Sequence, residues 1–210
     1  MSRVNFSLYL VTDRKQTSGR PLLEVVEKCL AAGVRAVQLR EKDLTTRELF
    51  ALATELRELT RGYGAALLIN DRIDVALALE ADGVHLPGDS FPAESARKIV
   101  GPDMLIGASS HSVAEAKEAE AGGADFIVFG PVFDTPSKRP YGPPQGLDAL
   151  RAVRQTISLP LFAIGGITPG RVRAVKEAGA DGVATISALL GAPDPGCATR
   201  DFLKELEARQ

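Results

Sequence analysis

Residues 161–187 have the sequence LFAIGGITPGRVRAVKEAGADGVATIS and contain a complete strand, helix and strand unit. The apolar run Leu161–Ile164 predicts a buried strand, which the glycines Gly165-Gly166 end. Thr168-Pro169 is typical of a helix start, with threonine at the N-cap and proline in the first helical position. A second apolar run, Val183–Ile186, follows the helix. This stretch therefore predicts a β-α-β unit, whose two strands are parallel.

The same unit recurs along the chain. Further strands are predicted by the apolar runs Leu8–Val11, Ala36–Leu39, Ala66–Ile69, Val84–Leu86, Leu105–Ala108 and Phe126–Phe129. Helix starts are marked by Pro21, Thr45 with Glu48, Pro92, Ser112 with Glu115, and Asp194-Pro195. A short echo precedes three strands: Gly-Ala-Asp at 123–125 and 179–181, and Ala-Asp-Gly at 81–83. Eight units in 210 residues without a linker predict one (β/α)₈ TIM barrel domain over residues 1–210. A doubly wound sheet is the alternative, but the first strand is not followed by its GxGxxG fingerprint.

The composition excludes several classes of function. Apolar residues make up 45% of the chain, charged residues 25%, and the net charge is −2, whereas a generic nucleic-acid binder has a large basic excess. No stretch approaches the roughly 20 apolar residues of a membrane span. Two cysteines, Cys29 and Cys197, are too few for a disulfide framework, and the first residues have no signal-peptide core. We therefore expect a cytoplasmic protein whose partners are neither nucleic acids nor membranes.

Active sites of (β/α)₈ barrels lie at the carboxyl ends of the strands. Most residues at or just past the ends of the predicted strands are polar or small: Asp13, Gln38, Arg40, Lys42, Asn70, Asp71, Ser90, Ser109, His111, Thr135, Ser137, Lys138, Gly165, Gly166, Ile186 and Ser187. This mixture of cations and small residues indicates a phosphorylated substrate. Gly165-Gly166 and Ile186-Ser187 follow the last two strands, where barrels often bind phosphate through backbone N–H groups. Simple tight turns are the alternative interpretation of both loops.

Three polar residues alternate at the end of the second strand. Gln38, Arg40 and Lys42 should therefore point to one side, and a planar guanidinium beside a mobile ammonium suits a diphosphate. A solvated run of charges is the alternative. Lys138 lies in the long polar loop 133–146, from which it could close over a ligand as a lid.

The remaining candidates concern metal binding and acid–base chemistry. Asn70 and Asp71 offer hard oxygen ligands that suit Mg²⁺, although Asp71 could instead cap the following helix. We interpret His85 as a hydrogen-bonded structural histidine of the fourth strand. His111 stands at a strand end beside two hydroxyls and is a candidate acid or base.

Seven short motifs occur in order along essentially the whole chain. They are Tyr9-Leu-Val-Thr-Asp13, Val37-Gln-Leu-Arg-Glu-Lys42, Ile69-Asn-Asp71, Ala81-Asp-Gly-Val-His85, Phe129-Gly-Pro-Val-Phe133, Thr135-Pro-Ser-Lys138 and Ala163-Ile-Gly-Gly-Ile167. Together they resemble the motifs of thiamine phosphate synthase, a family of (β/α)₈ barrels. That family joins the diphosphate of 4-amino-5-hydroxymethyl-2-methylpyrimidine to a thiazole phosphate and releases pyrophosphate. Thiazole tautomerase is a sister family that shares the barrel and many of the motifs.

The resemblance implies a role for each matching residue. By motif, the pyrimidine diphosphate would be held by Gln38, Arg40, Lys42 and Asn70, with Lys138 and Ser109 assisting. The thiazole phosphate would be held by Thr135, Ser137, Gly166, Ile186 and Ser187. Asp71 would bind Mg²⁺ as the cofactor. The implied partners are these two small phosphorylated substrates, and a homo-oligomer is compatible with the family.

The chain departs from the synthase pattern in two loops. After the fourth strand, synthases usually have Gly-Gln-x-Asp, whose aspartate is a second Mg²⁺ ligand. Here Pro87-Gly-Asp-Ser90 places Ser90 at that position and Asp89 one residue earlier. The loop after the sixth strand has Ser137 where synthases often have a second threonine, so the hydroxyl is kept.

The change at Ser90 leaves three further interpretations open. It moves the chain towards thiazole tautomerase, in which a histidine matching His111 would shuttle a proton. The retained Arg40, Lys42 and Asn70 favour the synthase, a transferase, over this isomerase. A non-catalytic sensor of phosphorylated ligands is another interpretation. A metal-dependent sugar-phosphate epimerase that uses His85 and His111 is the last.

Overall fold

The structure is a computed structural model that describes residues 3–135 and 142–208. Its strands are β1 (Leu8–Val11), β2 (Ala36–Leu39), β3 (Ala66–Asn70), β4 (Gly83–Leu86), β5 (Leu105–Ser110), β6 (Phe126–Phe129), β7 (Leu161–Ala163) and β8 (Gly182–Thr185). Each strand pairs in parallel with the next, and β8 pairs with β1, so that Leu8 lies opposite Val183. The sheet is therefore a closed barrel, and the predicted (β/α)₈ fold is confirmed.

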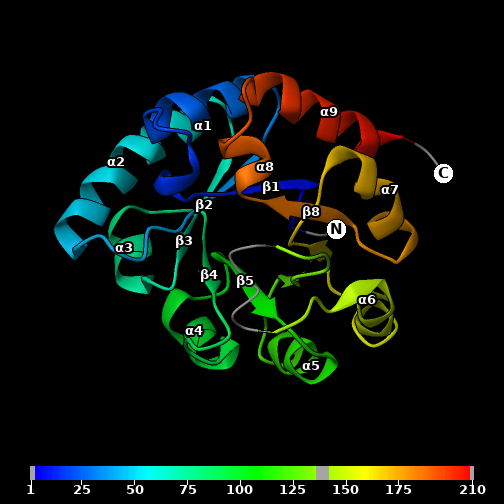
Figure 1. Ribbon diagram of the computed structural model, residues 1–210. Helices are drawn as coiled ribbons and strands as arrows, with labels where there is room; N and C mark the ends of the chain where they lie inside the picture. The colour runs from blue at the N-terminus through cyan, green and yellow to red at the C-terminus, as the bar shows by residue number, and fades with distance from the viewer. Residues whose placement is uncertain (1–2, 136–141, 209–210) are drawn as a thin grey trace.

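The helices surround the barrel (Figure 1). They are α1 (Leu22–Ala31), α2 (Thr46–Gly62), α3 (Ile73–Ala78), α4 (Ala93–Val100), α5 (Val113–Ala121), α6 (Gly146–Arg154), α7 (Pro169–Glu177), α8 (Ser187–Leu190) and α9 (Pro195–Glu207). A short 3₁₀ helix, η1 (Arg14–Gln16), follows β1. In the described part of the chain, no helix is both long and apolar enough to span a membrane.

Apolar side chains fill the space on both sides of the sheet. The main core lies between the strands and the helices, while a second cluster, centred on Tyr9, Phe126 and Phe162, fills the barrel interior. Phe6 precedes β1 and packs on these rings, with its centroid 5.3 Å from that of Phe162. The interior is thus a packed core, and side chains at the carboxyl ends of the strands rest on it.

The repeated aspartates tie pairs of neighbouring strands together. Asp82, Asp125 and Asp181 each precede an even-numbered strand, and each carboxylate accepts the backbone N–H of the strand before it, at 2.7, 2.7 and 2.8 Å. Each aspartate also pairs with an arginine of the helix that precedes the first strand of the pair, namely Arg57 of α2, Arg97 of α4 and Arg154 of α6. The short motif that recurs before three strands therefore marks a hydrogen-bonding arrangement that recurs in the structure.

The structure corrects several predicted boundaries. β5 continues to Ser110 instead of ending at Ala108, and β8 covers Gly182–Thr185 instead of Val183–Ile186. β7 ends at Ala163, one residue early, because Ile164 already belongs to the following loop. The short helix α8 has no counterpart in the sequence-based prediction. Its N-cap residue, Ile186, makes no side-chain capping bond, so local sequence carries no start signal.

The two predicted capping boxes have different outcomes. At α2, Thr45 and Glu48 exchange both hydrogen bonds, as predicted. At α5, Ser112 accepts the N–H of Glu115, but the Glu115 carboxylate accepts the backbone N–H of His111 at 2.7 Å. The second box is therefore only half formed, because the acidic side chain has a different partner.

Candidate active site

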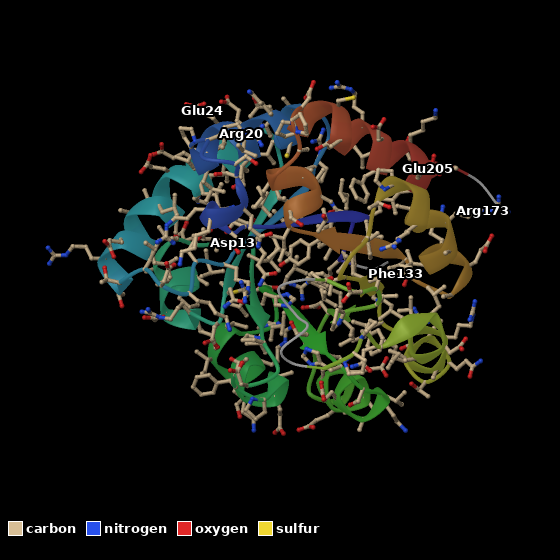
Figure 2. The ribbon with its side chains drawn as sticks, viewed as in Figure 1. Asp13, Arg20, Glu24, Phe133, Arg173 and Glu205 are labelled. Atoms are coloured by element: carbon tan, nitrogen blue, oxygen red, sulfur yellow. The ribbon has the colours of Figure 1, made fainter. Side chains whose placement is uncertain are left out.

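The polar strand ends gather at one end of the barrel. Figure 2 shows Asp13 after β1 and Phe133 after β6 inside the ring of helices, whereas Glu24, Arg173 and Glu205 lie on its outer side. Asp13 serves the fold here, because its carboxylate accepts the N–H of Lys15 at 3.0 Å and caps η1. The candidate site is built by the neighbours of these two residues at the same end.

Gln38 and Asn70 link the ends of β2 and β3. Gln38 is 3% exposed, and its side-chain amide donates to Asn70 Oδ1 over 2.9 Å. The pair fixes both amides, whose remaining donors and acceptors are available to a ligand. Thr12, at the end of β1, accepts the backbone N–H of Arg40 at 2.9 Å and fixes the chain where it leaves β2.

Arg40 and Lys42 are cations without protein anions. Neither side chain has a hydrogen bond or ion pair within residues 3–135 and 142–208, although Arg40 is half-buried. Glu41, between them, is buried and instead accepts from Arg14 at 3.1 Å. The common direction of Gln38, Arg40 and Lys42 stays a prediction. β2 ends at Leu39, and Lys42 lies beyond that end in an exposed turn.

Asp71 and Ser90 meet across the loops after β3 and β4. The Ser90 hydroxyl donates to Asp71 Oδ1, and Asp71 has a positive φ of 65°. The N-cap residue of α3 is Arg72, and no side chain caps this helix. The alternative role of Asp71 as a helix cap is therefore not seen. Asp89 has no hydrogen bond or ion pair with any residue the structure describes. Within that part, no three potential ligands among His, Cys, Asp and Glu cluster as a metal site.

His85 and Ser109 form a buried pair between β4 and β5. His85 Nε2 lies 2.9 Å from Ser109 Oγ, and His85 is 3% exposed. Burial, with a smaller effect from the Arg40 charge, lowers the pKa of His85 to about 3, so its ring is neutral. The interpretation of His85 as a hydrogen-bonded histidine of the fourth strand agrees with this geometry. Its partner in this contact, Ser109, is one of the predicted site residues.

His111 is exposed and directly follows the end of β5. Its Nδ1 lies 3.2 Å from Glu115 Oε2, in an ion-pair geometry between residues four apart. Its ring carbon Cε1 is 3.6 Å from where a side chain on Gly88 would begin. His111 does not contact His85 in the described structure, so the two histidines are not placed as a shared metal site.

The loops after β6 and β7 lie directly against each other. Phe133 N–H donates to the Gly165 carbonyl at 3.1 Å, and a Cβ on Gly166 would lie 2.6 Å from the Asp134 carbonyl oxygen. Both glycines have positive φ, 99° and 62°. Thr135 is half-buried and bonds back to the Phe133 carbonyl at 3.2 Å. Glycine is thus required for the close approach of the two loops.

Ile186 and Ser187 stand where β8 passes into α8. Ile186 is the N-cap of this four-residue helix, and exposed Ser187 is its first residue. The backbone N–H groups at such a start have no partner within the helix, which is suited to a phosphate oxygen. Ser137 and Lys138, the other candidates of this region, lie outside the described residues.

Sequence reasoning missed two residues that shape the site. Thr12 accepts the backbone N–H of Arg40, and its position directly after the first strand could have identified it in the sequence. Arg171 donates to the Gly166 carbonyl at 2.6 Å, and its guanidinium carbon lies 4.6 Å from the centroid of the Phe133 ring. No local pattern distinguishes Arg171 from an ordinary surface arginine of α7.

A large cavity lies at the other end of the barrel. It measures about 770 Å³ and is lined by Phe6, Ser7, Arg154, Ser158 and their neighbours, which lie at the amino ends of the strands. Residues at this end of (β/α)₈ barrels serve stability, and the catalytic loops are at the opposite end. We therefore do not place the active site there.

Comparisons with known proteins identify the family and agree with the fold. The family described as thiamine monophosphate synthase matches residues 8–189. A protein of Geobacter sulfurreducens is 54% identical over 100% of this chain and 98% of its own. The thiamine-phosphate synthase of Moorella thermoacetica is 47% identical over 97% of each chain. The solved thiamine phosphate pyrophosphorylase of Pyrococcus furiosus superimposes with a TM-score of 0.87 at 42% identity, covering 96% of each chain.

Fold and site together define a (β/α)₈-barrel enzyme whose polar residues gather at the carboxyl ends of the strands. Within that class, the chain belongs to the thiamine monophosphate synthase family. The resemblance of its motifs is confirmed, and so is the expected synthase function.

Proposed function

We propose that the described strand ends of this chain couple a pyrimidine diphosphate to a thiazole phosphate, forming thiamine phosphate and pyrophosphate. In this reaction the bond between the pyrimidine methylene and the diphosphate oxygen breaks, and the thiazole nitrogen forms a new bond to that methylene. The electron pair of the broken bond leaves with pyrophosphate. The protein has to neutralise this leaving group and position the nucleophile.

The main support for the proposal is the environment of Arg40. A half-buried guanidinium without a protein anion is costly unless a ligand supplies the negative charge. Arg40 stands beside the fixed Gln38–Asn70 pair, so a diphosphate there would meet both cationic and amide donors. Lys42 and, from its loop, Lys138 would add charge, and Ser109 would add a hydroxyl. These residues would therefore stabilise the departing pyrophosphate.

The site around Asp71 fits a magnesium ion that also binds the substrate. Mg²⁺ is usually held by one or two carboxylates together with substrate phosphates and water. Asp71 supplies one carboxylate, and the Ser90 hydroxyl beside it is a neutral oxygen at the position of the family's second ligand. Asp89, one residue before Ser90, is a second candidate ligand. When bound, Mg²⁺ would offset diphosphate charge, so this chain would depend more on the substrate oxygens than a site with two aspartates.

The loops after β6, β7 and β8 would hold the thiazole phosphate. Gly166 and the start of α8 at Ile186 and Ser187 offer backbone N–H groups, while Thr135 and Ser137 offer hydroxyls. In the ring of eight strands, β6 lies opposite β2, which Arg40 follows, whereas β8 is two strands from β2. A thiazole phosphate held at these loops would present its nitrogen to the reacting methylene from a side other than that of the leaving group.

The proposal includes small phosphorylated partners and a cytoplasmic location. Both cysteines are free, Cys29 buried and Cys197 exposed, as suits a reducing compartment. The net charge of −2 provides no general attraction for nucleic acid. A homo-oligomer is compatible with the fold, and the proposed site does not require one.

Removing the Arg40 charge tests the proposal. Arg40→Met should reduce the rate of thiamine phosphate formation on the order of 10²–10³-fold, because it removes one electrostatic contact to the leaving group. Arg47→Met is the matched control, since Arg47 is an exposed arginine of α2 outside the site. Product is measured with both substrates and Mg²⁺. Equal rates for the two variants would overturn the assignment of Arg40.

A further inference from the structure

We infer that His85 is a positioning residue that donates its Nε2–H to Ser109 and thereby directs the Ser109 hydroxyl towards the leaving diphosphate. The inference deepens the proposed function and rests on it for the identity of the ligand. It assigns a role to a buried side chain that does not itself reach the mouth of the barrel.

The contact between the two side chains is short and enclosed. His85 Nε2 and Ser109 Oγ are 2.9 Å apart, and the histidine ring packs against Tyr9 and Phe126, with centroids 5.9 and 6.1 Å away. Ser109 is half-buried near the end of β5. Its hydroxyl has no other hydrogen bond within residues 3–135 and 142–208. Ser109 thus links the barrel interior to the ligand end.

The surroundings of the second ring nitrogen select the tautomer. His85 Nδ1 is buried and has no hydrogen-bond partner among the described residues. It faces Gly107, where an added Cβ would lie 2.8 Å away, so this side of the ring meets closely packed backbone. A buried N–H without an acceptor is rarer and more costly than a buried acceptor without a donor. The proton of the neutral ring therefore belongs on Nε2.

This tautomer sets the direction of the serine hydroxyl. If Nε2–H donates, Ser109 Oγ accepts from His85, and the serine proton must point elsewhere. The side of Ser109 away from His85 is the carboxyl end of the barrel, where Arg40 lies. A hydroxyl held as a donor there can bond to a diphosphate oxygen that gains charge as the bond breaks. With the opposite tautomer, the serine proton would be used by His85.

The tautomer can be measured without any assay of activity. The chain has two histidines, so nitrogen-15 NMR of the labelled protein at neutral pH shows two rings, and a His111→Gln variant assigns them. We expect the His85 spectrum of an Nε2–H ring. An Nδ1–H ring would overturn the inference. Because this result does not depend on turnover, it is separate from any failure of the proposed function.

Kinetics of two amide variants test the consequence. The side-chain nitrogen that His85→Gln introduces can occupy the place of Nε2 and donate to Ser109, whereas the shorter amide of His85→Asn cannot reach it. We expect His85→Gln to retain kcat within about threefold and His85→Asn to lose about 10²-fold, with KM for the thiazole phosphate unchanged in both. Equal losses in both variants, with both folded by circular dichroism, would overturn the inference.

A double-variant cycle separates positioning from mere stability. If His85 acts through Ser109, then Ser109→Ala combined with His85→Asn is no slower than Ser109→Ala alone. If the two losses multiply, His85 acts independently of Ser109 and the inference fails. Should His85→Asn not fold, the NMR measurement on the intact protein still decides the tautomer.

Discussion

Single residues at the loops after β3 and β4 determine how this chain would bind magnesium. The Ser90 hydroxyl donates to Asp71, so the two residues are neighbours in space although their positions in the sequence differ by 19. This contact supports the alignment of Ser90 with the family's second metal ligand. The same geometry explains why the substitution matters, because a hydroxyl brings no charge to the pair.

Ser90→Asp should increase the response to Mg²⁺. A second carboxylate against Asp71 creates like-charge repulsion in the free protein, which Mg²⁺ would relieve. We expect a lower thermal midpoint without Mg²⁺, recovery when it is added, and a lower Mg²⁺ concentration for half-maximal activity. Ser95→Asp, at a position of α4 that is half-buried like Ser90, is the control. An unchanged Mg²⁺ titration would contradict the placement of this loop.

At the scale of structural elements, the contact between the loops after β6 and β7 is the most restrictive one at the proposed site. Gly166 has a positive φ and faces the Asp134 carbonyl so closely that a Cβ would lie 2.6 Å from it. Gly170, four residues on in α7, has open space around its Cα. A side chain is therefore excluded at Gly166 but tolerated at Gly170, although the two glycines are only four residues apart.

Gly166→Ala and Gly170→Ala should change the free energy of unfolding in opposite directions. We expect Gly166→Ala to lower the free energy of unfolding by at least about 1–2 kcal/mol and to raise KM for the thiazole phosphate, because it strains the backbone and separates the loops. Gly170→Ala should stabilise the protein by about 0.5–1 kcal/mol, since alanine is the better helix former. Chemical denaturation and initial rates measure both. Equal effects would show that the loop contact is unimportant.

Element types were predictable from local sequence, whereas several contacts and boundaries were not. Continuous apolar runs such as Phe126–Phe129 indicate strands covered on both faces, and the Thr45–Glu48 box carries its own start signal. Helix α8 lacks such a signal. It is held by burial of Leu189 and Leu190, which depends on the completed barrel. Likewise, the acceptor role of Glu115 depends on where β5 ends.

The candidate site was predictable to the extent that it follows from topology. Once the strands are parallel and adjacent, Gln38 on β2 and Asn70 on β3 come to the same end of the barrel. The register places Gln38 opposite Leu68, two residues before Asn70, and the two amides bond at 2.9 Å. The role of Arg171 could not be predicted, because it depends on packing against Phe133 from a distant loop. The pairing of His85 with Ser109 likewise requires the register of β4 and β5.

At the scale of the molecule, the two ends of the barrel have different roles. Phe6 packs against Tyr9, Phe126 and Phe162 at the amino end of the strands, while the proposed chemistry lies at the carboxyl end. Stability and activity should therefore respond separately to changes at the two ends.

Phe6→Ala should destabilise the protein and spare the chemistry. Phe6 is half-buried, so we expect a loss of about 2–3 kcal/mol in the free energy of unfolding, somewhat less than for a fully buried phenylalanine. Activity measured well below the unfolding temperature should be retained. Phe91→Ala, at a side chain that is 55% exposed, should change neither quantity. Loss of activity in folded Phe6→Ala would contradict the separation of the two ends.

The coupling reaction itself tests the central claim most directly. The purified protein is mixed with the pyrimidine diphosphate, the thiazole phosphate and Mg²⁺, and thiamine phosphate and pyrophosphate are quantified over time. We predict that the two products accumulate in equal amounts and that omitting either substrate stops both. Absence of thiamine phosphate from folded protein at saturating substrates, or isomerisation of the thiazole alone, would contradict the account.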